Sequence, residues 1–170
     1  MEEIRNKVAE SGLISMDLAD FKANQNSILE FNLENYLWQG LVLKEKDFRE
    51  AMQEHDWSQY QDKNVYIHCT ADAIVPTWAF MLVASKLEGI VNHYIVSSKA
   101  DLEKVLIQEK IAALDLNLPE FESKRYIIKG CADITSPAFA MTELMKKIQP
   151  TAKSIMYGEP CSTVPIFKRK

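Results

Sequence analysis

Residues 65–87 read VYIHCTADAIVPTWAFMLVASKL, and this stretch decides the expected fold. The short run of β-branched and aromatic residues at 65–69 predicts a strand. A turn follows, and Pro76–Leu87 predicts a helix, because proline is favoured in the first helical turn. The segment therefore indicates a strand-turn-helix element in which Cys69 stands where the strand ends.

The alternation of strands and helices extends to both sides of this segment. Apolar periodicity predicts further strands and helices. The extended segments are expected at 13–18, 27–33, 94–96, 126–128 and 154–157. The helices are expected at 46–55, 101–113 and 137–148. Strands that alternate with helices favour parallel pairing. The sequence thus predicts one α/β domain over residues 1–170, with a single, mostly parallel sheet and flanking helices. Residues 1–60 form its less regular part, and residues 64–165 form its alternating part.

A weak internal repeat supports this interpretation. Residues 126–148 read YIIKGCADITSPAFAMTELMKKI, and six of the 23 positions are identical to residues 65–87. Both copies predict a strand, a turn and a helix. Common descent of the copies is one explanation, and the general preference for Asp and Pro near a helix start is the other. Under either explanation, the two turns are expected at the same edge of the sheet.

Composition limits the classes of function. The chain has 170 residues, 47% of them apolar, and a net charge of −4, which is not the basic footprint of a nucleic-acid-binding domain. No signal peptide and no membrane-length apolar segment is visible, so we expect a cytoplasmic protein with no membrane association. Nothing in the sequence indicates an oligomeric state. Disulfides are rare in a reducing cytosol, and the three cysteines are therefore expected to be free, reactive or metal-bound.

All three cysteines follow a predicted strand, and they form the candidate site. Cys69, Cys131 and Cys161 would meet if the strand ends line one edge of a sheet, where ligands of α/β proteins bind. Three thiolates with one further donor suit zinc, iron or an exposed iron–sulfur cluster. The sequence therefore predicts a metal site made by the cysteines, with an oxygen or nitrogen ligand from Asp72, Asp133 or His68.

Two other roles for the cysteines stay open. Cys69 or Cys131 could be a reactive thiol that carries a persulfide or acyl group, since a following helix N-terminus stabilises a thiolate. Alternatively, all three could be inert packing residues. Asp72 and Asp133 have a competing role as helix caps. His68 is expected on the strand face opposite to Cys69, which argues against a catalytic pair of the two.

Three other features are interpreted structurally. His55 and His93 stand apart from the candidate ligands and are expected at the surface. Met81 lies in the most apolar helix and is expected in the core. Residues 158–165, which contain two prolines and no periodic pattern, predict a rigid turn that presents Cys161.

The segments CTADAIVPTWA at 69–79 and AKSIMYGEPCSTVP at 152–165 resemble signatures of a bacterial family of unknown function. KEKDFR at 44–49 and KGC at 129–131 resemble it as well, so that the resemblance spans nearly the whole chain. The resemblance implies that the genes of this family lie beside sulfur-mobilisation genes for iron–sulfur cluster assembly. The resemblance thus suggests an accessory role in that pathway, with iron–sulfur assembly proteins as partners, and carries no established activity.

Overall fold

Strands form where the sequence predicts them, but the described strands belong to two sheets and not to one. The computed structural model describes residues 12–116, 124–130, 133–159 and 161–170. A four-stranded sheet has the order β1-β5-β6-β7, and a three-stranded sheet has the order β2-β3-β4. All neighbouring strands are parallel except β6 and β7.

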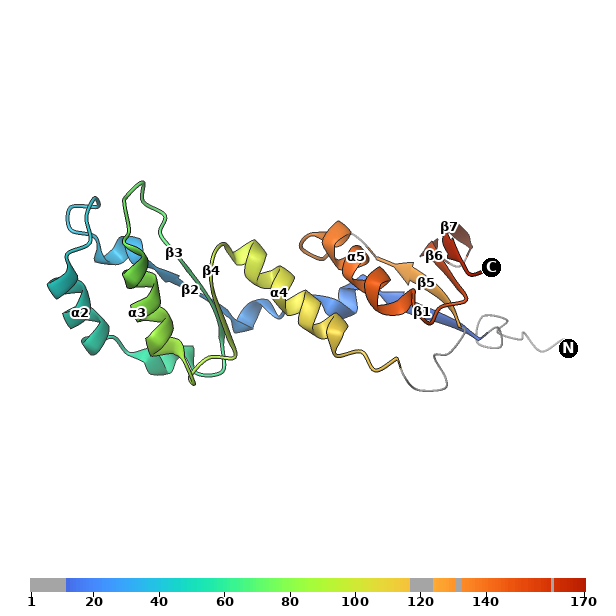
Figure 1. Cartoon of the computed structure of the whole chain (residues 1–170), viewed down its shortest axis with the longest axis horizontal. Coiled ribbons are helices and arrows are strands. Elements are labelled where there is room, and N and C mark those ends of the chain that lie inside the picture. The colour runs from blue at the N-terminus through green and yellow to red at the C-terminus, as the bar shows by residue number, and fades with distance from the viewer. Residues whose placement is uncertain (1–11, 117–123, 131–132, 160) are drawn as a thin grey trace, which may run out of the picture. The chain divides into compact units, whose positions relative to one another are not determined.

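The two sheets belong to two compact units of the chain. Unit 1 comprises residues 1–23 and 103–170, and unit 2 comprises residues 24–102. Unit 2 is therefore an insertion into the sequence of unit 1, as the colours of Figure 1 show along the ribbon. The mixed α/β class and the mostly parallel pairing are confirmed, whereas the prediction that the strands form one sheet was wrong.

Unit 2 contains three parallel strands and two helices that cover one face of their sheet. Buried Phe31, Val65 and Ile67 alternate along the strands and share one apolar cluster with residues of both helices. The alternate positions, including Glu30 and His68, face the opposite side, since successive side chains of a strand point to opposite faces. The elements are β2 (Ile28–Asn32), α2 (Glu45–Glu54), β3 (Asn64–His68), α3 (Thr77–Leu87) and β4 (His93–Val96).

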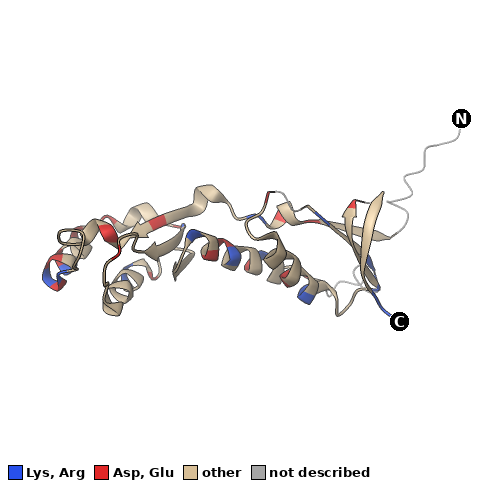
Figure 2. Ribbon diagram, turned by 90° about the horizontal axis from the view of Figure 1, so that it is seen from above, with Lys and Arg blue, Asp and Glu red and all other residues tan. Residues whose placement is uncertain are grey.

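Unit 1 repeats this plan with one additional strand. Ile107 of α4 and Leu144 of α5 pack with Tyr126 and Ile128 of the central strand in a second apolar cluster. Basic and acidic residues alternate along α4, so neither sign of charge gathers there (Figure 2). The elements are β1 (Leu13–Asp17), α4 (Lys99–Ala112), β5 (Arg125–Lys129), α5 (Pro137–Ile148), β6 (Ser154–Glu159) and β7 (Ser162–Lys168).

The two units correspond residue by residue from β3 to β4 in unit 2 and from β5 to the first residues of β6 in unit 1. An offset of 61 places β3 on β5 and β4 on the first residues of β6. The registers agree as well, because Asn64 pairs with His93 and Arg125 pairs with Ser154. The strand-turn-helix form predicted for both copies is confirmed, and their common descent stays a hypothesis.

The first strand of each unit ends in the same way. A 3₁₀ helix follows β1 at Leu18–Phe21 and β2 at Leu33–Tyr36. Each is capped by the last strand residue: the Asp17 side chain accepts the amide hydrogen of Ala19, and the Asn32 side chain accepts that of Glu34. Short polar side chains at these positions satisfy amides that a helix start leaves unpaired.

Two sequence predictions about local structure need correction. Residues 158–165 do not form one rigid turn, because Ser162 begins β7, which runs antiparallel to β6. Pro165 lies in this edge strand, where a missing N–H group costs no ladder bond. Met81 is 68% exposed and does not belong to the core.

In the described part of the chain, no helix is both long and apolar enough to cross a membrane.

Candidate functional site

Cys69 lies at the carboxyl end of β3 in unit 2, where the sequence places it. It is a half-buried free thiol, and its Sγ lies 3.7 Å from the Ala71 carbonyl oxygen that accepts its weak hydrogen bond. The thiol lines a cleft of about 330 Å³, which we call the thiol cleft. The other lining residues are Ile67, His68, Ala71, Ala73, Val75, Phe80, Val96 and Ser97.

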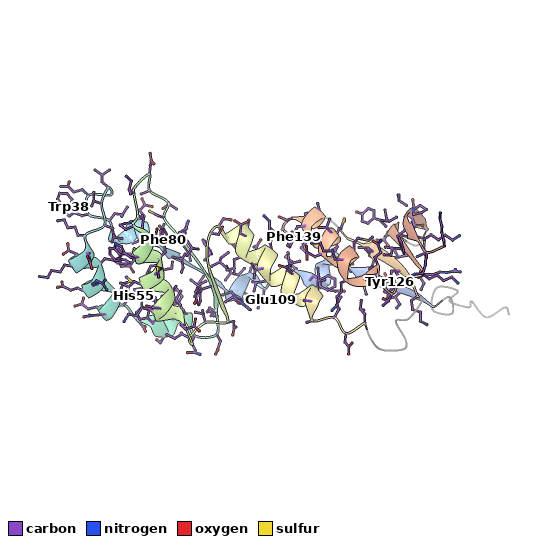
Figure 3. All side chains as sticks on the ribbon, in the orientation of Figure 1. Trp38, His55, Phe80, Glu109, Tyr126 and Phe139 are labelled. Carbon is purple, nitrogen blue, oxygen red and sulfur yellow. The ribbon has the colours of Figure 1, made fainter. Side chains whose placement is uncertain are left out.

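The walls of the thiol cleft come from β3, the loop after it, α3 and the end of β4. Phe80 belongs to α3 and is labelled in Figure 3. Ala73 and Val75 belong to the loop after β3, and Val96 ends β4. Ser97 adds a hydroxyl group that donates a hydrogen bond of 2.6 Å to Asp101. Apolar side chains and polar groups both line the cleft, and the polar side chains among them are those of Cys69, His68 and Ser97.

A polar cluster occupies the face of the sheet that the helices leave open. The Nε2 atom of His68 pairs with Glu30 on the neighbouring strand. Burial raises the pKa of Tyr66, and the charge of Glu30 and its hydrogen bond with Tyr66 act in the same direction. His68 therefore has a carboxylate partner of its own across the strand. No bond joins His68 to Cys69 in the described structure, as expected from their opposite faces.

A second network fixes the loop that carries the thiol. The Asn32 side chain donates a 2.8 Å hydrogen bond to the Thr70 hydroxyl and accepts one of 3.3 Å from the Thr70 amide. Thr70 also bonds to the carboxylate of Glu34. Because Asn32 caps the 3₁₀ helix as well, one side chain ties together the loops after β2 and β3. The sequence did not identify these partners, since only the pairing of β2 with β3 brings them together.

His55, which the sequence places at the surface, is half-buried and contributes to an aromatic cluster. Its ring lies 4.6 Å from that of Trp57 and is stacked on Tyr60, and its Nδ1 lies 3.1 Å from the Tyr36 hydroxyl. Burial lowers the pKa of His55, although nearby Asp56 opposes this shift. Burial also raises the pKa of Tyr60 to about 12. The imidazole is therefore neutral near pH 7 and acts as a packing residue.

The corresponding edge of unit 1 has different chemistry. Gly130 occupies the position of Cys69, with a φ of +83°, and a Cβ atom there would lie 2.4 Å from Oδ1 of Asp17. Lys129 occupies the position of His68, and its Nζ lies 4.0 Å from Asp17. At equivalent positions of the two units, unit 2 therefore has a thiol in its cleft and unit 1 has a lysine–aspartate pair.

The predicted metal ligands do not all fall in one unit. Cys69 lies in unit 2, whereas Cys161 is exposed in the turn between β6 and β7 of unit 1. Cys131 lies outside the described residues. The two turns of the repeat follow strands of different sheets, so the expectation that they share one sheet edge was wrong. Among the described residues, no group of three or more His, Cys, Asp and Glu side chains could hold a metal ion.

Neither candidate aspartate caps an α-helix. The N-cap residues of α3 and α5 are Pro76 and Ser136, and neither helix start has a side-chain capping bond. Asp133 instead forms a 2.9 Å ion pair with Lys22. Asp72 is exposed in the loop after Cys69. The capping role was therefore wrong for both residues, and their role as ligands stays a prediction.

Comparison with known proteins identifies a family and no activity. The family described as "Protein of unknown function (DUF2480)" matches residues 2–169 of the chain. Searches of curated proteins and of solved structures give no match. The geometry of the site is therefore the basis on which a function has to be argued.

Proposed function

The chain belongs to the DUF2480 family, whose description names no activity, and from the geometry of unit 2 we propose that Cys69 is a reactive thiol that carries sulfur as a persulfide. The single observation that carries the proposal is the position of Cys69 in the thiol cleft at the carboxyl edge of a parallel sheet. Ligands of open α/β folds bind outside this edge.

The environment of Cys69 suits such a carrier. A half-buried thiol in an open surface cleft can be reached by a small donor. The network of Asn32 and Thr70 holds the loop that begins at Cys69, so that the thiol stays in the cleft. A cleft of about 330 Å³ is at the small end of the range for ligand sites, as a small donor requires.

The reaction is an exchange between a thiol and a persulfide. The Cys69 thiolate attacks the outer sulfur of a donor persulfide, the sulfur–sulfur bond of the donor breaks, and the donor leaves as a thiolate. Cys69 then holds the transferred sulfur, and an acceptor thiol removes it by the same chemistry. Proteins of iron–sulfur cluster assembly, which the sequence resemblance implies as partners, consume sulfur of this kind.

The test is incubation of the purified protein with a small persulfide, such as glutathione persulfide, followed by mass spectrometry of each cysteine peptide. We expect the mass of one additional sulfur atom on the Cys69 peptide, and its loss in Cys69→Ser. Cys161→Ser is the matched control, because Cys161 is free and more exposed but does not line the cleft. Sulfur that accumulates on Cys161 as readily as on Cys69 would exclude a specific carrier.

A metal site in unit 1 is the second candidate function, and the strand order favours it. β5 and β6 are parallel neighbours, and in the sequence Cys131 follows β5 and Cys161 follows β6 by two residues each. We propose that zinc or iron, the latter alone or in an iron–sulfur cluster, binds at this edge through Cys131, Cys161 and Asp133. Thiolates with a carboxylate form an accepted ligand set for both metals.

Metal content of protein purified without oxygen tests this second candidate. We expect near-stoichiometric zinc or iron in the natural sequence and its loss in Cys131→Ser and Cys161→Ser, because each removes a thiolate ligand. Cys69→Ser is the control, and this variant is expected to keep the bound metal because Cys69 lies in unit 2. Equal metal content in the natural protein and both unit 1 variants would contradict the site.

A further inference from the structure

Four large apolar side chains protrude from unit 2 and form one continuous surface. Ile74 is 90% exposed, Leu41 61%, Val42 52% and Trp38 48%. We call this surface the apolar knob. Monomeric proteins rarely expose apolar side chains in such a group, and a group of this kind usually marks an interface.

The apolar knob is an ordered structure. Val42 pairs with Trp38 in an antiparallel bridge and with Ile74 in a parallel bridge, so that Val42 lies between the other two. These bridges join the loop after β2 to the loop after β3. A surface that is fixed before binding loses little conformational entropy when a partner covers it.

Two charges of opposite sign accompany the knob. The Lys44 ammonium lies 4.0 Å from the centre of the Trp38 ring, at one end of the row. Asp72 is exposed and precedes Ile74 by two residues in the sequence. In the described part of the chain neither residue forms an ion pair, whereas nearby Lys46 and Arg49 are paired with Glu50 and Glu45.

This arrangement is complementary to a copy of itself. A two-fold axis that passes near Val42 places Trp38 and Lys44 of one chain opposite Ile74 and Asp72 of the other, and the reverse. Such isologous contacts are the usual basis of symmetric dimers. We propose that the apolar knob is the interface of a homodimer, with Lys44 and Asp72 as reciprocal ion pairs at its rim.

The inference goes beyond the proposed function and does not rest on it, because it uses no property of the Cys69 thiol. The two sites are nevertheless neighbours. Ala73 and Val75, on either side of Ile74, line the thiol cleft. A second copy that covers Ile74 therefore lies beside the cleft, where it can affect access to the thiol.

Sedimentation equilibrium of the full chain at several concentrations tests the interface. We expect the natural sequence to sediment at twice the chain mass of 19.5 kDa. Ile74→Asp places a carboxylate opposite the apolar Trp38 ring of the other chain and is expected to weaken dimerisation roughly 30-fold. Met81→Asp is the matched control, because Met81 is also an exposed apolar residue of unit 2 but lies on α3, outside the knob. We expect it to leave the dimer intact.

Charge exchange gives an independent test with conservative surface changes. Lys44→Glu and Asp72→Lys each create like-charge contacts, and each is expected to weaken the dimer about 10-fold. The double variant restores the opposite pairing and is expected to recover the affinity of the natural sequence. A monomer at the highest concentration, equal effects of Ile74→Asp and Met81→Asp, or no recovery in the double variant would each overturn the proposal.

Discussion

Replacement of Phe31 by alanine is expected to lower the free energy of unfolding of unit 2 by about 3–5 kcal/mol. Phe31 is 2% exposed and lies at the centre of the aromatic cluster. Its ring lies 5.6 Å from Tyr36 and 5.5 Å from both Trp57 and His55. The substitution removes a buried ring and leaves a cavity that rigid aromatic neighbours cannot fill.

Tryptophan fluorescence during urea unfolding measures this effect directly. Trp38, Trp57 and Trp78 are the three tryptophans of the chain, and all lie in unit 2. Phe31→Leu is the matched control, because it keeps most of the buried volume and is expected to cost roughly 1–2 kcal/mol through lost ring contacts. Equal midpoints for the two variants would contradict the prediction, because they would show that the buried volume kept by leucine does not stabilise unit 2.

Gly130→Ala is expected to destabilise unit 1 by about 2 kcal/mol. One part, about 1 kcal/mol, is the strain of a left-handed φ of +83° for a residue with a Cβ atom. The other part arises because the new Cβ atom would lie 2.4 Å from Oδ1 of Asp17. Asp17 would have to move, and the 3₁₀ helix after β1 would lose its cap at a cost of about 1 kcal/mol.

Thermal unfolding followed by circular dichroism separates the two parts. Gly89→Ala is the matched control, since Gly89 has a φ of +75° and nothing within 4 Å of the added Cβ atom. It is expected to cost about 1 kcal/mol from strain alone. In an Asp17→Ala background, Gly130→Ala should cost no more than Gly89→Ala. If Gly130→Ala is as mild as Gly89→Ala in the natural sequence, the close approach of Asp17 has no energetic role.

Local patterns predicted the elements of this fold well, because each element depends on residues close in sequence. The strand at 65–69 and the helix at 76–87 lie within one residue of β3 and α3. The weak repeat between 65–87 and 126–148 predicted two strand-turn-helix copies, and their registers agree. β7 was missed because Pro165 interrupts its pattern, and an edge strand tolerates proline.

The division into two sheets could not be predicted from such patterns. Neighbours in sequence usually pair in a sheet, but β1 pairs with β5 about 110 residues later. Ion pairs and networks that depend on this topology, such as Lys22 with Asp133, were therefore invisible. For the candidate site, the sequence predicted that Cys69 lies at a strand end. It did not predict that α3 and β4 contribute walls of the cleft, or that Asn32 holds the loop that begins at Cys69.

The insertion of unit 2 into unit 1 has a consequence for synthesis of the chain. On the ribosome, β1 emerges before unit 2, and all of unit 2 follows before its partner β5 is made. At 5–20 residues per second, β1 waits roughly 5–20 s without a partner strand. Unit 2, by contrast, has all three of its strands by Val96 and can fold while the ribosome still holds the chain. Unit 2 is thus expected to fold before unit 1 can complete its sheet, and in that interval the unpaired edges of β1 are open to pairing with other chains.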